Sequence, residues 1–332
     1  MIESDAAAGY RGKTVVLTGA AGYIGTAILR QLRSVECAVR ALVPPHKLDA
    51  VMPSLQAIGP SGIRVEGCDI RATEDFEPWL EGADIVFHLA AQTSHYEANA
   101  KPREDFEISV SPALRLLEAC RRSARAPRVV FASSATVVGL PKTLPVDELA
   151  ACFPVTVYDV HKICVEGYLS FFSLAHDVPT CALRLANVYG VGSAATKPDR
   201  GITNLMAKRA VAGEDLTIYG SGVWLRDYVH LSDVARAFLH AGLASKEIVS
   251  GRAFNICTGI GSRFVDVLEL IVSEAEQVSG KRSRVVHVDK TLSPIDERSY
   301  IGTHAAFTAA SGWAPIVPLR AGISELVRAS AG

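Results

Sequence analysis

The sequence predicts an α/β fold built on a doubly wound parallel sheet. Short runs of β-forming residues alternate with helical patterns through the first half of the chain, which is the order that a parallel sheet covered by helices on both faces requires. The first apolar run, 14–17, leads into glycines at positions 19, 22 and 25, and a glycine-rich turn at that point is typical of the Rossmann type. We expect strands at 14–18, 38–43, 63–65, 85–89, 128–132 and 179–185, and helices at 22–33, 104–123 and 158–175.

The turn after the first strand has the properties of a phosphate-binding loop. Gly19 would form the tight turn, Gly22 would let a pyrophosphate approach the backbone, and Gly25 would let the helix pack closely on the sheet. Tyr23 and Ile24 open that helix, whose free N–H groups would face the phosphates. The GxxGxxG spacing is one residue longer than the usual fingerprint, and a simple tight strand-to-helix turn is the alternative.

The second and third strands bear on which dinucleotide is bound. Residues 39–47 hold no carboxylate for a ribose 2′-hydroxyl, whereas Arg40, His46 and Lys47 would favour a 2′-phosphate. This slightly favours NADP(H) over NAD(H), although these side chains would also suit an exposed surface with the ribose held by backbone. Asp69 follows the third strand and would accept from the adenine amino group, or would be an ordinary strand-end aspartate.

A tyrosine and a lysine one helical turn apart form the candidate catalytic pair. Tyr158 and Lys162 share a helix face, and an ammonium group there would lower the pKa of a phenol that is otherwise a poor base at neutral pH. Lys162 would also hold the nicotinamide ribose. Ser134, at the end of the fifth strand, would bond to the substrate oxygen that gains or loses the proton. An incidental i, i+4 pair is the alternative.

The predicted elements suggest a division of the chain into two domains. We expect a flexible tail over 1–12, an NAD(P)-binding Rossmann domain over 13–185, and a smaller α+β substrate domain over 186–332, where the alternation becomes irregular. Some elements are expected to cross between the two domains.

Composition excludes several classes of partner. A formal net charge of −1 provides no global field for nucleic acid or an anionic membrane, and no apolar stretch approaches the roughly 20 residues that span a bilayer. The 7 cysteines include no CxxC pair, so we expect free thiols and no metal site. The first twelve residues lack the apolar run of a signal peptide, and we expect a cytoplasmic protein.

Several longer motifs occur in order between residues 13 and 328. They are GAAGYIG (19–25), HLAA (88–91), SSATVVG (133–139), YDVHK (158–162), LRLANVYG (183–190), GEDLTIYGSGVWLRDYVHLSDVARA (213–237), FNICTG (254–259) and GWAP (312–315). In this order they resemble the extended short-chain dehydrogenases/reductases of the NAD(P)-dependent epimerase/dehydratase superfamily.

The resemblance implies a nucleotide-diphosphate sugar as the partner. Arg226 and Arg298 match arginines that hold the diphosphate, which suits bidentate guanidinium recognition, although a salt bridge from Arg226 to Asp227 is the alternative. Asn187 matches a position that contacts the sugar or diphosphate. The remaining expected positions are Ser133 for substrate and Ile70, Leu89, Ala90 and Ala91 for cofactor.

A homodimer is also implied, through the tyrosine helix and the helix before it. Val165, Leu169 and Phe172 fit either that interface or ordinary core packing. The identity of the sugar would depend on loops at 92–102, 190–203 and 290–300.

Departures from the family pattern narrow the reaction. The 4,6-dehydratases carry Thr-Asp-Glu where this chain has Ser134-Ala135-Thr136, so the acid and base for eliminating water are missing. Epimerases usually have Tyr-Gly-x-Ser-Lys, whereas an Asp follows Tyr158 here, as in NDP-4-keto-6-deoxyhexose 4-ketoreductases. Ser109 occupies a position where the family usually has Asn. Whether this chain has the family's water-mediated proton relay to Lys162 is therefore open.

Three functions follow from the resemblance. We favour reduction of an NDP-4-keto-6-deoxyhexose at C4, with Tyr158 as proton donor. The alternative is an NDP-hexose 4-epimerase of the UDP-glucose 4-epimerase type with retained NAD, which would use the same residues. A non-catalytic NADP(H)-sensing protein is a third possibility, although such proteins usually lose the tyrosine or the lysine.

Overall fold

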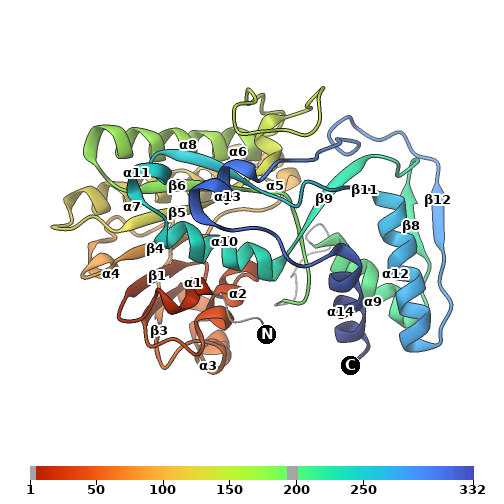
Figure 1. Ribbon diagram of the computed structural model, residues 1–332, viewed down its shortest axis with the longest axis horizontal. Helices are drawn as coiled ribbons and strands as arrows, with labels where there is room; N and C mark the ends of the chain where they lie inside the picture. The colour runs from red at the N-terminus through yellow and green to blue at the C-terminus, as the bar shows by residue number, and fades with distance from the viewer. Residues whose placement is uncertain (1–4, 193–200) are drawn as a thin grey trace.

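A seven-stranded parallel sheet forms the larger part of the protein in the computed structural model, which describes residues 5–192 and 201–332 (Figure 1). The strand order is β3-β2-β1-β4-β5-β6-β10. The chain winds outward from β1 in one direction and from β4 in the other, which confirms the doubly wound, Rossmann-type fold and creates a crevice at the carboxyl ends of β1 and β4. The strands are β1 (Thr14–Thr18), β2 (Ala38–Val43), β3 (Gly62–Gly67), β4 (Ile85–His88), β5 (Arg128–Ser134), β6 (Thr180–Leu185) and β10 (Arg252–Ile256).

Apolar layers cover both faces of this sheet. Alternation along β1 sends Val15 and Leu17 into one layer and Val16 into the other. The first layer contains side chains of α2 (Tyr23–Leu32), α10 (Leu231–Leu243) and α13 (Ala305–Ser311). The second contains side chains of α4 (Glu77–Leu80), α7 (Ser111–Arg122) and α8 (Val157–His176). Burial on both faces explains why the strands read as continuous apolar runs.

The helix predicted over 104–123 is two helices. The structure has α6 (Pro102–Ser109) and α7 (Ser111–Arg122), separated at Val110. Pro112 lies at the start of α7, and a proline inside a continuous helix would remove a backbone hydrogen bond and clash with the preceding turn. The remaining elements beside the seven-stranded sheet are α3 (Leu48–Ile58), α5 (His95–Ala100), α11 (Lys246–Val249) and the 3₁₀ turns η1 (Pro45–Lys47) and η2 (Ala135–Val138).

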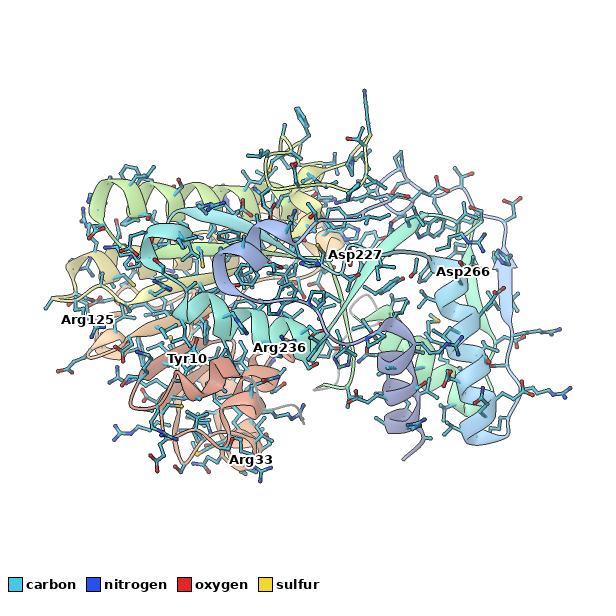
Figure 2. All side chains as sticks on the ribbon, viewed as in Figure 1. Tyr10, Arg33, Arg125, Asp227, Arg236 and Asp266 are labelled. Atoms are coloured by element: carbon cyan, nitrogen blue, oxygen red, sulfur yellow. The ribbon has the colours of Figure 1, made fainter. Side chains whose placement is uncertain are left out.

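The described part of the predicted tail, residues 5–12, packs against α10 and β4. It contains α1 (Asp5–Ala8), and Tyr10 is fully buried (Figure 2). The Tyr10 hydroxyl donates to the backbone oxygen of Leu239 at 2.9 Å, and its ring centroid lies 6.2 Å from that of Phe87. An aromatic ring buried against α10 and β4 fixes this segment to the sheet.

A smaller unit lies beside the sheet and forms a core of its own (Figure 1). It contains a three-stranded sheet in the order β11-β9-β7 and a two-stranded parallel sheet of β12 and β8. Strand β10 pairs with β6, so the predicted boundary at 185 is crossed by the chain, as expected of some elements. The elements are β7 (Asn187–Tyr189), α9 (Ile202–Ala212), β8 (Leu216–Tyr219), β9 (Leu225–His230), β11 (Gly261–Arg263), α12 (Phe264–Ser279), β12 (Val285–Val288) and α14 (Leu319–Ala331).

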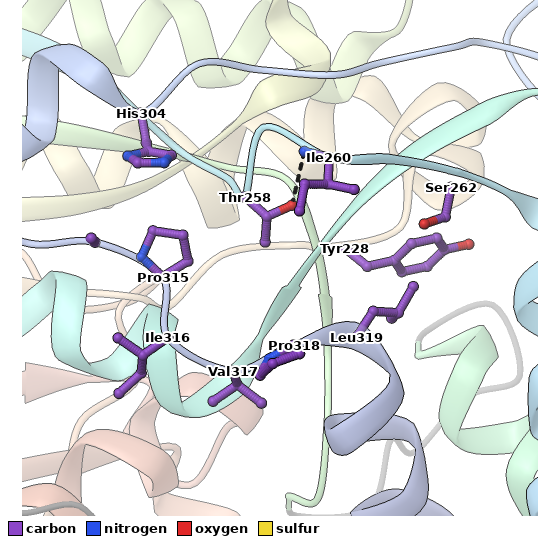
Figure 3. Close-up of a pocket in the computed structure, with 11 residues that line it drawn as sticks. Tyr228, Thr258, Ile260, Ser262, His304, Pro315, Ile316, Val317, Pro318 and Leu319 are labelled. Carbon is purple, nitrogen blue, oxygen red and sulfur yellow. Dashed lines mark hydrogen bonds between the residues drawn. The ribbon is translucent and has the colours of Figure 1, made fainter.

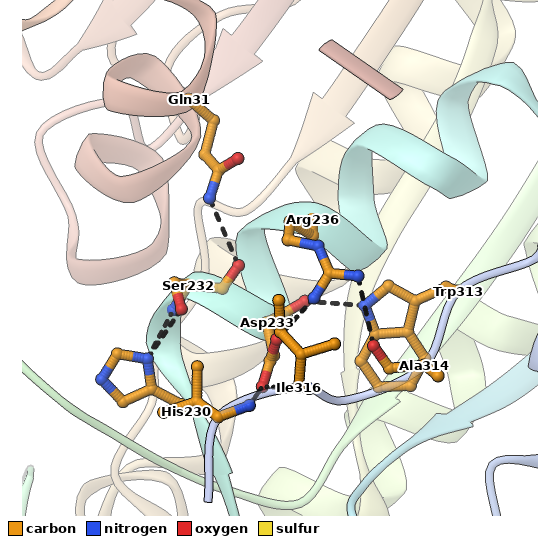
Figure 4. A network of polar contacts seen from close by, with 9 residues as sticks. Gln31, His230, Ser232, Asp233, Arg236, Trp313, Ala314 and Ile316 are labelled. Carbon is orange, nitrogen blue, oxygen red and sulfur yellow. Dashed lines mark hydrogen bonds and ion pairs between the residues drawn. The ribbon is translucent and has the colours of Figure 1, made fainter. Parts of the chain in front are cut away.

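A polar network joins α10 to the chain before α14 (Figure 4). The fully buried Asp233 carboxylate accepts from Arg236 at 2.6 Å and from the backbone N–H groups of Ile316 and Val317. The Trp313 indole donates to the Asp233 carbonyl oxygen at 2.9 Å. These bonds satisfy a buried charge and hold the GWAP segment against the first domain.

Candidate active site

The glycine loop has the shape of a phosphate cradle. Gly19 has φ 69°, and a Cβ added there would lie 3.0 Å from the amide nitrogen of Ala90. A Cβ at Gly25 would lie 2.5 Å from the carbonyl oxygen of Gly19. No side chain caps α2 at Gly22, so the N–H groups of Tyr23 and the residues after it are oriented for an anion. The loop therefore fits a dinucleotide pyrophosphate.

The segment after β4, which contains the predicted cofactor residues Leu89, Ala90 and Ala91, lies against this loop. Thr18 Oγ1 accepts from the backbone N–H groups of Leu89 and Ala90, each at 3.2 Å. Having accepted twice, the Thr18 hydroxyl donates to His88 Nδ1 at 2.9 Å. Burial lowers the pKa of His88 to about 3, so this histidine is a neutral structural partner.

Tyr23 connects the cofactor loop to the second domain. Its hydroxyl donates to the backbone oxygen of Gly190 at 2.5 Å, and burial raises its pKa to about 12. Residues 193–200, within the 190–203 loop expected to affect sugar identity, lie outside the described residues.

Arg40 does not occupy the predicted ribose position. It pairs in register with Val16, two residues before the end of β1, rather than at the carboxyl edge of the sheet. Its Nη1 donates to the backbone oxygens of Trp79 and Glu81, each at 2.7 Å. The side chain is thus committed to the chain around α4. This geometry does not support the prediction that Arg40 binds a 2′-phosphate, whereas His46 and Lys47 are exposed at η1 after β2.

Asp69, the predicted adenine ligand, lies beyond the end of β3 and accepts hydrogen bonds from Arg71. Arg71 donates to both of its carboxylate oxygens, at 3.2 and 3.1 Å, and the pair lowers the pKa of Asp69. Ile70 follows and is half-buried against the apolar layer of α7.

A cavity of about 300 Å³ brings together five of the predicted site residues. Ser134 reaches it from β5, Tyr158 from α8, and Asn187 from the start of β7, while Arg226 comes from β9 and Arg298 from the loop after β12. The cavity therefore joins the catalytic and diphosphate-binding predictions in a single site between the two units.

Lys162 lies under Tyr158 and is buried. Its Nζ is 5.5 Å from the centroid of the Tyr158 ring and 4.6 Å from that of Phe131, and it donates to the Ala132 carbonyl oxygen at 2.7 Å. Burial lowers the pKa of Lys162 to about 8, against the opposing carboxylates of Asp105 and Glu166. An ammonium group this close to the phenol ring stabilises a phenolate.

Ser133 is not among the residues that line the cavity, so the geometry does not support the prediction that it binds substrate. Successive residues of a strand point to opposite faces. Ser134 lines the cavity, whereas the Ser133 hydroxyl donates to Glu166 at 2.5 Å. Glu166 is also paired with the Arg184 guanidinium at 2.7 Å. Ser133 is therefore part of a buried ion-pair network behind β5.

Arg226 and Arg298 approach each other in the cavity. Burial lowers the pKa of Arg226 to about 10, and the charge of Arg298 acts in the same direction. Each donates to a backbone oxygen, Arg226 to Asp296 at 2.7 Å and Arg298 to Thr136 at 3.0 Å. Two guanidinium groups that line one cavity favour a dianionic ligand.

The alternative of a salt bridge between Arg226 and Asp227 is excluded. Asp227 follows Arg226 on β9 and so points to the other side of the strand, where it is fully buried. Its carboxylate accepts from the N–H and hydroxyl of Thr258, each at 2.8 Å, and from the N–H of Gly259 at 3.0 Å.

Sequence reasoning missed a polar chain behind Ser134. The Ser134 and Thr136 hydroxyl oxygens are 2.8 Å apart, and Thr136 donates to Asp159 Oδ1 at 2.5 Å. Arg298 Nη2 is 3.8 Å from Asp159 Oδ2. The signal was present, because Asp159 follows Tyr158 where the family usually has glycine, but only the fold brings η2 and α8 together.

A second missed pair lies one turn from Ser109. His161 Nδ1 and Asp105 Oδ2 are 2.5 Å apart. Ser109, at the position of the family asparagine, accepts from the Gln92 N–H at 3.3 Å.

A second cavity, of about 380 Å³, lies between Tyr228, Thr258 and the segment 314–319 (Figure 3). Pro315, Ile316, Val317 and Leu319 make much of its wall apolar. None of the predicted site residues lines it, so the chemistry belongs to the cavity at Tyr158. In the described ranges, no cluster of His, Cys, Asp or Glu has a geometry that holds a metal ion, and no helix there is long and apolar enough to cross a membrane.

These features define a dinucleotide-binding fold with a serine, a tyrosine and a lysine at the carboxyl edge of its sheet. The chain belongs to the NAD dependent epimerase/dehydratase family, whose model matches residues 15–257. This confirms the resemblance to extended short-chain dehydrogenases/reductases and establishes an NAD(P)-dependent enzyme family.

Relatives and solved structures agree with this assignment over nearly the whole chain. The UDP-glucose 4-epimerase of Azospirillum brasilense is 28% identical over 91% of this chain and 87% of its own length. The structure of UDP-glucose 4-epimerase from Thermotoga maritima with UDP-glucose has a TM-score of 0.82 at 26% identity, covering 95% of this chain and 97% of that chain. The Thermus thermophilus UDP-glucose 4-epimerase complex with NAD has a TM-score of 0.79 at 28% identity, covering 96% and 99%.

Proposed function

We propose that this protein interconverts the C4 epimers of a UDP-hexose, using bound NAD. The observation that carries the proposal is the cavity in which Ser134 and Tyr158 face Arg226 and Arg298. It offers a proton-transfer group at one end and paired cations for a diphosphate at the other. Several of the similar proteins are named as UDP-glucose 4-epimerases, which favours the epimerase over the ketoreductase expected from the sequence.

The residues of the cavity have distinct roles in this reaction. When bound, the nicotinamide supplies a hydride acceptor and then a hydride donor at C4. Tyr158 takes the proton of the C4 hydroxyl as the carbon is oxidised, and returns it to the oxygen on reduction. Lys162 stabilises the phenolate that takes this proton and that is restored when the proton is returned. Arg226 and Arg298 hold the diphosphate while the keto sugar turns its other face to the cofactor, with Asn187 beside them.

The choice of NAD replaces the slight preference for NADP(H). That preference used Arg40, whose guanidinium is bonded to the carbonyl oxygens of Trp79 and Glu81. Mass spectrometry of the nucleotide released by denaturing fresh protein tests the choice. Retained NAD(H) supports the epimerase. Protein that is free of nucleotide and binds NADPH reversibly would instead support a 4-ketoreductase.

A non-catalytic NADP(H) sensor is the less favoured alternative, because Tyr158 and Lys162 are both kept and lie 5.5 Å apart, measured from Nζ to the ring centroid.

We further propose a cytoplasmic homodimer. The seven cysteines are free thiols, which suits a reducing compartment. Val165, Leu169 and Phe172 are core residues at 1, 3 and 4% exposure and cannot form the interface. Phe171 and Leu174 of α8 are exposed instead, and light scattering that finds a monomer would contradict the dimer.

A further inference from the structure

We propose that Asp159 is a positioning residue that acts through Thr136 to make Ser134 a hydrogen-bond acceptor toward the substrate. The cavity would then hold the C4 alcohol of a sugar nucleotide more tightly than the C4 ketone. This inference rests on the proposed function and names residues of the same site that no part of the family pattern assigned.

The direction of the hydrogen bonds follows from the donors available. A carboxylate accepts but does not donate, so the proton between Thr136 Oγ1 and Asp159 Oδ1, 2.5 Å apart, belongs to Thr136. A hydroxyl carries one proton. Thr136 therefore accepts across the 2.8 Å contact with Ser134, and the Ser134 proton points to Thr136.

The Ser134 oxygen is left with an accepting role. It accepts the backbone N–H of Thr136 at 3.3 Å, and a hydroxyl oxygen has two lone pairs. The second lone pair is available to the cavity that Ser134 lines. A C4 hydroxyl can donate a hydrogen bond to this lone pair of Ser134. A C4 ketone oxygen has no proton to donate, so the lone pairs of the two oxygens would repel each other.

The surroundings keep this arrangement in place. Asp159 is 1% exposed, and its N–H is capped by Thr156 Oγ1 at 3.1 Å in the first turn of α8, where a carboxylate is favoured by the helix dipole. Arg298 supplies the opposite charge at 3.8 Å and also donates to the Thr136 carbonyl oxygen at 3.0 Å. Weaker binding of the ketone suits an intermediate that must rotate inside the cavity to present its other face to the cofactor.

The test measures binding without turnover. In a Tyr158→Phe background, which removes the phenol as a competing donor, calorimetry gives the Kd of UDP-6-deoxyglucose and of UDP-4-keto-6-deoxyglucose, ligands that differ only at C4. Asp159→Asn provides an amide that can donate to Thr136, so Thr136 can donate to Ser134 and Ser134 to the ketone. We expect the preference for the alcohol to fall by about tenfold, the size of one net hydrogen bond.

Two variants of Thr136 make the result independent of the folding of Asp159→Asn. Thr136→Val removes the acceptor of the Ser134 proton and should shift the preference in the same direction. Thr136→Ser keeps the hydroxyl and should retain the original preference. Equal alcohol-to-ketone ratios in all of these variants, with both ligands bound, would overturn the inference. Failure of the Tyr158→Phe protein itself to bind either ligand would instead count against the proposed substrate class.

Discussion

Tyr158 and Lys162 lie one helical turn apart on α8 but differ in their surroundings. Tyr158 lines the cavity and is half-buried, whereas Lys162 is 5% exposed beneath it. The lysine is therefore costly to bury, and the tyrosine benefits from its charge. Function and stability make opposite demands on this pair.

Replacement of the phenol should abolish proton transfer. Tyr158→Phe keeps the ring and loses the hydroxyl that is placed to exchange a proton at C4. We expect turnover of a UDP-hexose to fall by about 10²- to 10⁴-fold, the usual contribution of a positioned acid–base group. Nicotinamide content, measured on the same preparation, should not change. Full activity in this variant would remove Tyr158 from the reaction.

Replacement of the lysine should have a stability signature that depends on pH. Burial lowers the pKa of Lys162 from 10.5 to about 8, so the unfolded chain binds more protons than the folded protein between these values. Wild-type stability gains from this residue as pH rises through that window. Lys162→Met lacks the gain.

We expect the free energy of unfolding of Lys162→Met, relative to wild type, to fall by about 2 kcal/mol between pH 7 and pH 10. Urea titrations of both proteins at the two pH values measure this difference. A difference that does not change with pH would show that Lys162 is not buried as described.

The packing of α2 onto the end of β1 determines the shape of the phosphate loop. A Cβ on Gly25 would lie 2.5 and 2.7 Å from the backbone oxygens of Gly19 and Ala20, and backbone atoms cannot rotate away as a side chain can. The helix would have to move away from the loop.

Gly25→Ala should therefore lose nicotinamide and cost about 1–3 kcal/mol of stability, the range for overpacking. Gly167→Ala is the matched control, because an added Cβ in the exposed middle of α8 would meet nothing within 4 Å. That variant should gain about 0.5–1 kcal/mol from helix propensity and keep its cofactor. Equal melting temperatures and equal nicotinamide content in the two variants would contradict the close packing of α2.

At this scale the sequence predicted elements that are defined by local patterns. The strands at 14–18 and 38–43 match the structure residue for residue, because strands buried on both faces consist mostly of apolar, β-forming residues. Strand β10 escaped prediction, since only its pairing with β6 identifies it as part of the central sheet.

The site residues divide in the same way, into those that local sequence patterns predict and those that only tertiary structure defines. The side of the strand on which Ser133 and Ser134 lie, and the register that places Arg40 short of the sheet edge, depend on tertiary structure. The same is true of the contact between Thr136 and Asp159, which joins segments 23 residues apart.

Contacts between segments distant in sequence hold the whole molecule together. The contact made by the N-terminal segment differs most from the sequence prediction, which was a flexible tail. Tyr10 is 0% exposed and bonds to Leu239. Tyr10→Phe should cost about 1 kcal/mol for the lost hydrogen bond, and Tyr10→Ala about 3–5 kcal/mol for the cavity. Urea titration measures both changes in the free energy of unfolding. A Tyr10→Ala protein as stable as wild type would show that this segment does not pack on the sheet as described.

The central claim, epimerisation at C4, is tested most directly by NMR of purified protein with UDP-galactose or UDP-glucose and no added nicotinamide. We expect each sugar nucleotide to convert to the other and both reactions to reach the same ratio. No conversion from either side, together with NADPH oxidation when an NDP-4-keto-6-deoxyhexose is added, would contradict the epimerase and identify a 4-ketoreductase.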